Sequence, residues 1–156
     1  MRIEYNMDLG WRFHRGELPE NDPRAKGKSH SVVYMNCKSG VAGGGAKKEY
    51  DDSDWREVDL PHDYFTESEM GEEYLLSGGY RKQDNAWYRK TFNLSSDLKG
   101  KALTLCFEGT AVNAEFYFNG SLMARSFSAY TETVFDITDR AYFDGRPNVL
   151  AVHIDG

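Results

Sequence analysis

The side chains best suited to chemistry lie between residues 62 and 85. Two carboxyl groups can divide the roles of acid and base only where their surroundings push their pKa values apart. Nothing near the glutamates of this segment indicates such a pocket, so we expect them to be solvated loop charges and predict no catalytic residue in the chain. These glutamates are Glu67, Glu69, Glu72 and Glu73.

His62 and Asp63 follow Pro61 and form a second group of interest. We expect Asp63 to be a turn carboxylate that accepts backbone N–H bonds, with His62 packed beside it. The alternative is a contact between this segment and a neighbouring domain. A Ser–His–Asp triad is not indicated, because the chain has no nucleophile elbow.

Length and composition exclude several classes of protein. The 156 residues suffice for one domain with its own core, and we assign residues 1–156 to it. The net charge of -6 excludes a generally basic nucleic-acid binder, and no apolar run approaches the ~20 residues of a membrane span. Cys37 and Cys106 form neither a disulfide framework nor a metal site, so we expect no metal and no cofactor. No secretory h-region follows Met1, and the compartment stays open between the cytoplasm and the periplasm or exterior.

The elements that must position these groups are strands. Aromatic residues make up 14% of the chain, and 15 glycines supply turns. From Trp87 onward, apolar and polar residues alternate with the two-residue period of a strand. Asn119 and Gly120 predict a tight hairpin, because both residues tolerate positive φ. We therefore predict an all-β, antiparallel jelly-roll β-sandwich of eight or nine strands, including segments at 9–13, 32–35, 87–92, 103–108, 112–119, 122–126, 133–137 and 150–154.

Two stretches are expected to be loops. Residues 39–48 contain Gly40 and three consecutive glycines at 43–45, which is typical of a flexible, poorly ordered segment. Residues 64–86 form an irregular excursion that also contains glycines. A loop of that length inside a compact domain is usually functional.

A set of short motifs resembles one known family in order and spacing. Each motif is weak alone, but together they resemble the N-terminal jelly-roll domain, called the sugar-binding domain, of glycoside hydrolase family 2, the β-galactosidase and β-glucuronidase group. The Pro-His-Asp form is most similar to the bacterial β-galactosidase-type branch. The motifs are Asp54-Trp55-Arg56, Leu60-Pro61-His62-Asp63, Trp87-Tyr88-Arg89-Lys90-Thr91-Phe92, Phe107-Glu108-Gly109, Phe118-Asn119-Gly120, Phe135-Asp136-Ile137-Thr138 and Asn148-Val149-Leu150-Ala151-Val152.

This resemblance implies an accessory role. Enzymes of the family carry two catalytic glutamates on a TIM barrel, which this chain does not contain, so the chain is not expected to perform the reaction alone. The implied parent hydrolyses terminal β-linked sugars, most similarly to a β-galactosidase, and the domain supports its catalytic barrel. In relatives, the loop before Trp87 reaches the bound sugar. By position, the implied substrate-binding residues are therefore Gln83, Asp84 and Asn85, with Asp63 as a further candidate.

Two other functions remain open. An autonomous carbohydrate-binding or lectin-like module would present aromatic platforms to a sugar ring, and Trp11, Trp55 and Trp87 are candidates, although core packing also accounts for them. The other alternative is a purely structural domain without sugar contact. If a flanking strand is missing, we expect self-association through an uncovered sheet edge or apolar face near residues 149–154.

Overall fold

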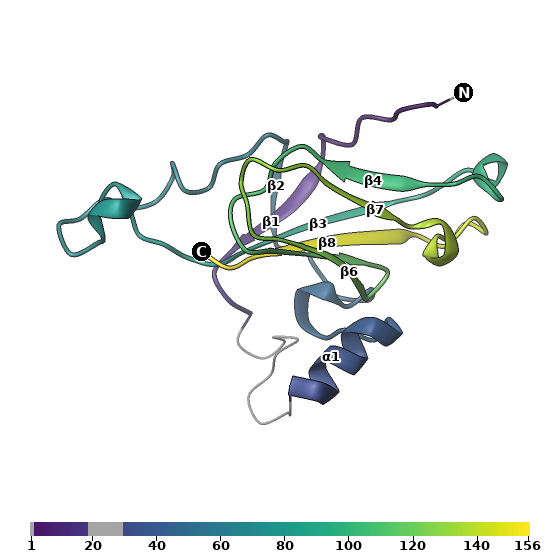
Figure 1. Cartoon of the computed structure of the whole chain (residues 1–156), viewed down its shortest axis with the longest axis horizontal. Coiled ribbons are helices and arrows are strands. Elements are labelled where there is room, and N and C mark those ends of the chain that lie inside the picture. The colour runs from purple at the N-terminus through teal and green to yellow at the C-terminus, as the bar shows by residue number, and fades with distance from the viewer. Residues whose placement is uncertain (1, 19–29) are drawn as a thin grey trace.

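The computed structural model describes residues 2–18 and 30–156, which are built mainly from strands. The described strands are β1 (Trp11–Arg15), β2 (Arg56–Val58), β3 (Ala86–Phe92), β4 (Thr104–Phe107), β5 (Ala114–Phe118), β6 (Ser121–Ser126), β7 (Thr133–Asp136) and β8 (Asn148–Ile154). The helices are short: α1 (His30–Ser39) and the 3₁₀ helices η1 (Gly44–Ala46), η2 (Leu76–Gly78), η3 (Ser96–Leu98) and η4 (Thr138–Arg140). The predicted all-β class is confirmed (Figure 1).

The strands form two antiparallel sheets. Six of them lie in the order β2-β1-β3-β8-β5-β6, and β4 pairs with β7 in a second sheet. Strands β3 and β8 pair along their full length, from Ala86 opposite Ile154 to Phe92 opposite Asn148. Because this pair has a further strand on each side, the middle of the large sheet has no open edge.

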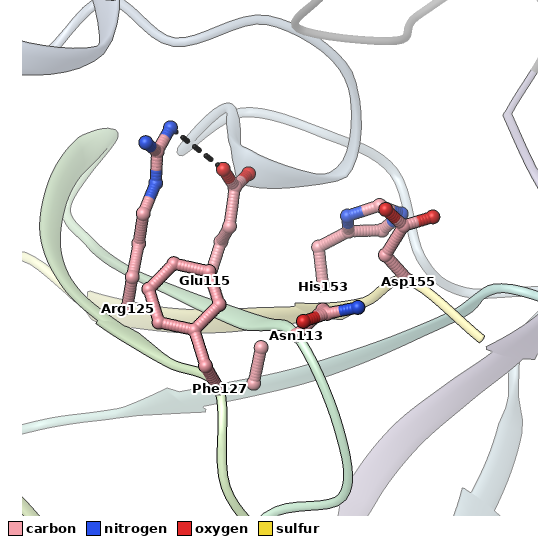
Figure 2. A pocket seen from close by; sticks show the side chains of 7 residues that line it. Asn113, Glu115, Arg125, Phe127, His153 and Asp155 are labelled. Atoms are coloured by element: carbon pink, nitrogen blue, oxygen red, sulfur yellow. Dashed lines mark ion pairs between the residues drawn. The ribbon is translucent and has the colours of Figure 1, made fainter.

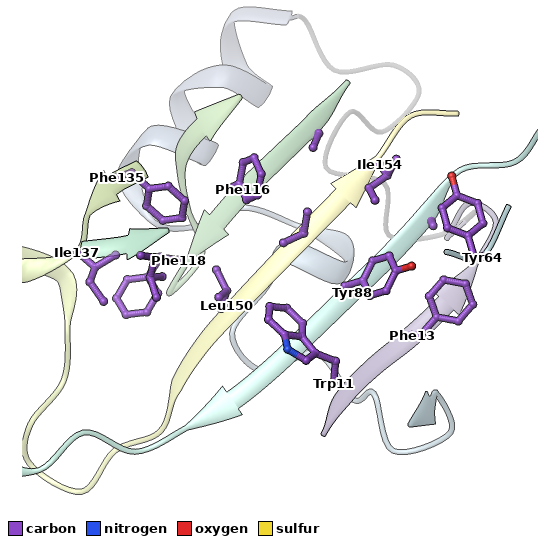
Figure 3. Close-up of a cluster of buried hydrophobic side chains, with 14 residues drawn as sticks. Trp11, Phe13, Tyr64, Tyr88, Phe116, Phe118, Phe135, Ile137, Leu150 and Ile154 are labelled. Atoms are coloured by element: carbon purple, nitrogen blue, oxygen red, sulfur yellow. The ribbon is translucent and has the colours of Figure 1, made fainter. Parts of the chain in front are cut away.

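The main core lies between the two sheets. Its centre is Phe116 of β5, which is fully buried and contacts Phe107 at 4.6 Å and Phe135 at 5.7 Å between ring centroids. Alternate residues of the central strands point into this space, as the period-2 pattern predicts (Figure 3). The buried members are Trp11, Phe13, Tyr64, Ala86, Tyr88, Leu105, Ala114, Phe116, Phe118, Phe135, Ile137, Leu150, Val152 and Ile154.

A second layer covers the opposite face of the large sheet. Helix α1, η1 and the segment through Trp55 pack against Trp87, Tyr117 and Ala151. All seven residues of β8 are therefore buried. The expected uncovered edge or apolar face near residues 149–154 is wrong, because β8 lies inside the sheet and the outer strands among those described are β2 and β6.

The glycine-rich residues 39–48 also differ from the expected flexible loop. Residues 44–46 form η1, and all three are buried. A Cβ atom at Gly45 would lie 2.6 Å from Cε3 of Trp87, so the absent side chain is what allows the backbone to approach the indole ring. Gly44 and Gly45 are thus packed against the sheet, whereas Gly43 is exposed.

A buried arginine holds this stretch on the sheet. The Arg89 side chain is 1% exposed and forms an ion pair of 2.8 Å with Asp52. Its guanidinium also donates to the carbonyl oxygens of Gly45 and Lys47. These bonds satisfy the buried charge and join β3 to a segment about 40 residues earlier.

The short strand expected at residues 32–35 is wrong, since these residues belong to α1. Val33 and Cys37 stand one helical turn apart and both pack on the second core. The helix ends before Gly40, whose φ of 82° is the left-handed conformation that commonly terminates helices. Docking on the sheet therefore overrides the strand preference of the β-branched valines.

The hairpin predicted at Asn119 and Gly120 is confirmed. Their φ angles of 48° and 77° are positive, and the turn joins β5 to β6. The Asn119 side chain also accepts a bond from the Val149 N–H at 2.9 Å and donates to the side-chain oxygen of Asn148 at 2.9 Å. The turn residue thus anchors the start of β8 as well.

Candidate functional site

Several strand ends meet at one end of the sandwich, which we call the exit end. Ala86 pairs with Arg15 and with Ile154, and Ala114 pairs with Ile154 and Ser126. The exit end is defined by these five residues and by the loops that follow or precede them. Figure 1 shows the C-terminus at this end.

A projecting segment, residues 69–82, extends from the exit end and is called the arm. Its two limbs are joined by backbone bonds of 2.9 Å from Lys82 N–H to the Glu69 carbonyl and from Gly71 N–H to the Tyr80 carbonyl. Helix η2 lies at its tip, and Figure 1 shows the arm standing away from both sheets. The exposed large apolar residues of the arm are Met70, Leu75, Leu76 and Tyr80.

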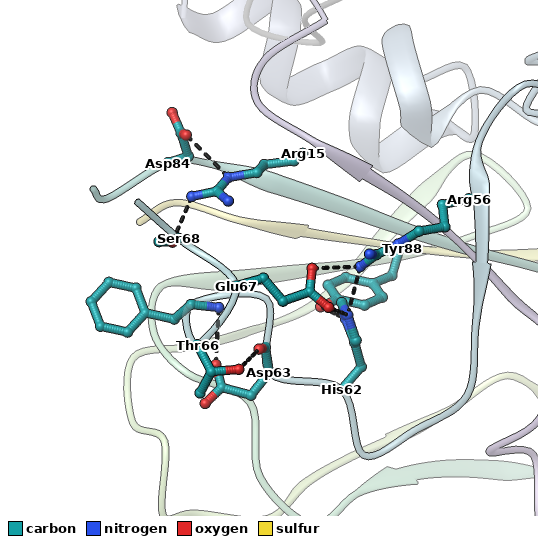
Figure 4. Close-up of polar contacts among 10 residues, drawn as sticks. Arg15, Arg56, His62, Asp63, Thr66, Glu67, Ser68, Asp84 and Tyr88 are labelled. Carbon is teal, nitrogen blue, oxygen red and sulfur yellow. Dashed lines mark hydrogen bonds and ion pairs between the residues drawn. The ribbon is translucent and has the colours of Figure 1, made fainter. Parts of the chain in front are cut away.

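A polar network fixes the chain just before the arm (Figure 4). Arg56 Nη2 donates to Glu67 Oε2 at 2.7 Å, and His62 Nδ1 lies 2.7 Å from the Tyr88 hydroxyl on β3. The hydrogen bond from Arg56 is the main reason that the pKa of Glu67 lies below its usual value. Burial raises the pKa of the Tyr88 hydroxyl, which therefore stays protonated at neutral pH. Glu67 is thus a paired charge and not a purely solvated one.

Asp63 occupies the turn predicted for it. Its side chain is exposed, and Oδ1 accepts a bond from the Phe65 N–H at 3.0 Å. Its carbonyl accepts from the Thr66 hydroxyl at 2.7 Å. His62 lies beside it and packs its ring on Phe13 at 4.8 Å. These contacts fit the structural interpretation of Asp63, and its carboxylate still faces solvent.

Asp84 is a structural anchor at the base of the arm. Its carboxylate lies 3.2 Å from Arg15 Nε and 3.5 Å from Lys82 Nζ. The buried Tyr64 hydroxyl donates to the Asp84 carbonyl at 2.9 Å. This set of bonds ties the base of the arm to β1 (Figure 4).

Asn85 and Gln83 flank this anchor and differ from each other. The Asn85 amide donates to the Glu17 carboxylate, and its oxygen accepts the Gly156 N–H at 3.0 Å. Gln83 is exposed, and its amide lies beside Gly78 of η2. The structure therefore brings all three predicted residues to the exit end, with Gln83 more exposed than the other two.

The tryptophans are not available as sugar platforms. Trp11, Trp55 and Trp87 are all buried. Exposed aromatic residues at the exit end are instead Tyr80 in the arm and Phe127 and Tyr130 in the loop between β6 and β7. Phe127 was not among the sequence candidates, because nothing in a strand-to-loop junction distinguishes an aromatic side chain that turns outward from one that turns inward.

Other kinds of site receive no support from the described residues. Across residues 2–18 and 30–156, no group of three or more His, Cys, Asp or Glu side chains is arranged to hold a metal ion. Within the same residues, no helix has the length and apolar character needed to cross a membrane.

Comparison with known proteins shows the family of this domain. Residues 60–156 match the family model described as glycosyl hydrolase 2 galactose-binding domain-like. The chain belongs to glycoside hydrolase family 2. This family 2 domain is 32% identical over 157 residues to the β-galactosidase BoGH2A of Bacteroides ovatus, an alignment that covers 99% of the chain and 15% of the relative. It is 33% identical over 109 residues to a β-galactosidase of Thermoanaerobacter pseudethanolicus, which covers 70% of the chain and 14% of that relative.

Solved structures agree with this family. A β-glycosidase from Bacteroides vulgatus matches 96% of the family 2 domain and 17% of its own length, with a TM-score of 0.75 and 27% identity. A family 2 member from Bacteroides cellulosilyticus matches 95% of the domain and 17% of its own length, with a TM-score of 0.69 and 29% identity. The predicted family and the predicted galactose-binding-like sandwich are confirmed, and the chain spans about 15% of the length of the relative BoGH2A.

Proposed function

We propose that this chain is the non-catalytic N-terminal domain of a retaining glycosidase of the β-galactosidase type, which supports a catalytic barrel and extends its arm into the substrate pocket. The relatives named as β-galactosidases, and their much greater length, support this proposal. Family 2 relatives named as β-glucuronidases are also similar, at 31% identity. The choice of a β-galactoside over a β-glucuronide is therefore a more specific proposal than the glycosidase role.

The feature that carries the proposal is the arm. Its apolar tip is exposed, with Leu75 and Leu76 67% and 70% accessible. Clusters of exposed apolar side chains mark sites of protein interaction, and the base of this arm is held by ion pairs rather than left loose. A fixed base with an uncovered tip suits a segment that is completed by contact with another domain.

The loops beside the arm extend the same surface. Val112 lies between β4 and β5, and Tyr130 lies between β6 and β7, and both are exposed. The two loops contact each other, because a Cβ atom at Gly109 would lie 2.7 Å from the carbonyl oxygen of Ala129. We assign the barrel-facing surface to the arm together with these loops.

The four predicted substrate-binding residues divide their roles in this proposal. Gln83 supplies an amide to the sugar, since an amide both donates to and accepts from hydroxyl groups. Asp84 and Asn85 position Gln83 through their bonds to β1 and to the end of the chain. Asp63 supplies an exposed carboxylate to the adjoining domain.

The test uses the protein that carries this chain together with its barrel. Replacing Leu75 and Leu76 with serine should lower kcat/KM for a nitrophenyl β-galactoside about 10-fold, and Gln83→Ala should raise KM by a similar factor. Met35→Ser is the matched control, because Met35 is equally exposed but lies on α1 in the other layer. Unchanged kinetics in the arm variants, or glycoside hydrolysis by the 156-residue chain alone, would overturn the proposal.

A further inference from the structure

His62 lies on the chain shortly before the arm, and the proposed function gives it no role. Its side chain is 12% exposed. Nδ1 of the ring lies 2.7 Å from the Tyr88 hydroxyl, and Nε2 lies 2.9 Å from Arg56 Nη2 and 3.2 Å from Glu67 Oε1. Both ring nitrogens therefore have close polar neighbours, which Figure 4 shows gathered around the ring.

These neighbours decide where the ring carries its proton. A guanidinium donates and cannot accept, so His62 Nε2 is the acceptor of the 2.9 Å bond from Arg56. The ring is then neutral and carries its proton on Nδ1, which donates to the Tyr88 hydroxyl oxygen. The two hydrogens of Arg56 Nη2 are divided between His62 Nε2 and Glu67 Oε2, which lies at 2.7 Å. This set of bonds requires a neutral ring.

A proton on Nε2 reverses the preference of the ring. The new N–H repels the donor of Arg56 and meets Glu67 Oε1, which already stands at 3.2 Å. Arg56 is 50% exposed and can turn toward solvent, whereas the His62 ring is packed on Phe13 at 4.8 Å. Protonation thus gives Glu67 a charge-assisted bond to a ring that is fixed against β1 and β3.

The other ionisable groups near the ring do not compete for this proton. Asp63 and Tyr64 also lie close enough to act on the Tyr88 hydroxyl. Asp63 Oδ1 accepts the Phe65 N–H, and burial raises the pKa of the Tyr64 hydroxyl, which stays neutral. A histidine gains its proton between pH 5 and 8, and the pKa of Glu67 lies below its usual value of 4.5. In mild acid a charged ring and a charged carboxylate therefore coexist.

Glu67 connects the ring to the arm. Its neighbours in the chain, Thr66 and Ser68, offer their carbonyl oxygens to Arg81 Nη1 at 2.8 and 3.0 Å. Arg81 lies on the returning limb of the arm beside Lys82, whose N–H bonds to the outgoing limb at 2.9 Å. A bond that holds Glu67 therefore also steadies the joint between the two limbs.

We propose that His62 is a pH-dependent positioning residue for the arm, whose ring accepts from Arg56 when neutral and holds Glu67 when protonated. Mild acid then stiffens the base of the arm. Any consequence for catalysis rests on the proposed function, whereas the exchange of partners belongs to this chain. The two can fail separately, because the tests below use this chain and involve no barrel.

A second buried histidine must be distinguished from His62. His153 on β8 is 2% exposed, lies 3.9 Å from Glu17 and lines a cavity of about 200 Å³ beside Glu115 (Figure 2). The lining of this cavity comes from β5, β6, β8 and the residues next to them. The Glu115 amide therefore reports on His153, and the amides at the base of the arm report on His62.

The first test reads the ring directly. Long-range ¹H–¹⁵N spectra of the labelled 156-residue chain distinguish a protonated ring nitrogen from an unprotonated one. While its ring is neutral, His62 should carry the proton on Nδ1, and Arg56→Met should remove this preference because Nε2 can then donate to Glu67. Arg12→Met is the matched control, since Arg12 lies on β1 and donates to the Trp55 carbonyl. A neutral ring protonated on Nε2 in the unchanged chain would overturn the proposal.

The second test measures hydrogen exchange of the Lys82 amide. After correction for the intrinsic effect of pH, exchange should slow about 2–5-fold as the His62 ring gains its proton. His62→Gln and Glu67→Gln should each abolish this change, because the first side chain does not titrate and the second carries no charge. His14→Gln is the control and should keep the response, since the His14 ring packs on Trp55 at 5.3 Å instead.

Three results of the exchange test would contradict the proposal. One is exchange at Lys82 that does not follow the titration of the His62 ring. Another is a response that survives both His62→Gln and Glu67→Gln. The third is a response that follows the Glu115 amide, which would assign the effect to His153.

Discussion

Strand β8 and the arm are held in opposite ways. All seven residues of β8 are buried, with hydrogen-bonded neighbours on both sides and packed layers above and below. The arm is joined by a few backbone bonds, and its apolar side chains at Leu75 and Leu76 stand in solvent. Stability in such a molecule is not uniform, and segments with little burial open at far lower free energy than the core.

The arm itself divides into a fixed base and an exposed tip. The base of the arm is fixed by ion pairs between Asp84 and both Arg15 and Lys82, whereas its tip lacks burial. Rigid elements place an interacting segment accurately, and an exposed tip leaves its apolar surface for a partner. Matched substitutions in the two regions test this separation directly.

The largest contrast is expected between Phe116→Ala and Leu76→Ala. Phe116 is fully buried and Leu76 is 70% exposed. Removing the Phe116 ring should lower the free energy of unfolding by about 3–5 kcal/mol, and removing the Leu76 side chain should change it by less than about 0.5 kcal/mol. Urea denaturation of the isolated chain measures both. Similar losses would mean that the arm packs as tightly as the core.

The next contrast compares two arginines. Arg89→Ala leaves the Asp52 carboxylate and several carbonyl oxygens without their donor, and should cost about 3 kcal/mol of unfolding free energy. The Arg81 guanidinium donates to the carbonyls of Thr66 and Ser68 and is not buried, so Arg81→Ala should cost about 1 kcal/mol or less. Chemical denaturation measures the unfolding free energy of both variants. Equal losses would mean that the contacts of Arg81 in the arm stabilise the fold as much as those of Arg89 in the second layer.

Glycine substitutions give a smaller contrast. A methyl group at Gly45 would overlap the Trp87 ring, so Gly45→Ala should destabilise the chain by about 1–3 kcal/mol. At Gly78 the new Cβ atom would stand 3.5 Å from its nearest neighbours, so Gly78→Ala should change stability by less than about 1 kcal/mol. Thermal unfolding of both variants reports the difference. If Gly45→Ala left the thermal stability unchanged, that result would favour the flexible loop predicted for residues 39–48.

The smallest contrast depends on pH. The folded-state pKa of Glu67 lies below its usual value of 4.5, chiefly because Arg56 donates to it. A lowered pKa stabilises the fold fully above the unfolded value, and this stability is lost as the pH falls through the lower folded value. Because Glu67 is 42% exposed, Glu67→Gln should cost only about 0.5 kcal/mol at neutral pH.

The control for this prediction is Glu72→Gln, a change to an exposed glutamate of the arm. Urea denaturation at pH 7 and near pH 3 should show a smaller Glu67→Gln deficit at the lower value, and no deficit for Glu72→Gln at either. A deficit that persists in acid would show that packing, rather than charge, supplies the contribution of Glu67.

The sequence predicted the parts of the fold that local pattern controls. The strands from 86 to 154 and the turn at Asn119 were found because alternation and positive φ are properties of neighbouring residues. Helix α1 was missed because Val32 and Val33 favour strands and only docking against the sheet makes the helix. Gln83, Asp84 and Asn85 were named from their position before Trp87, but the bonds of Asp84 to Arg15 and of Asn85 to Glu17 were not predicted.

The sequence alone determined the strands after residue 86, because a period of two assigns each residue to a face without any distant contact. The family came from the resemblance of short motifs, which the comparisons confirm. Only the tertiary structure decided that β8 is covered on both faces, that Gly44 and Gly45 are buried, and that the tip of the arm is exposed. Those features rest on contacts such as Arg89 with Gly45 and Arg15 with Asp84, which join residues 44 and 69 positions apart. No local pattern encodes such contacts, since they exist only after the sheet has brought the two segments together.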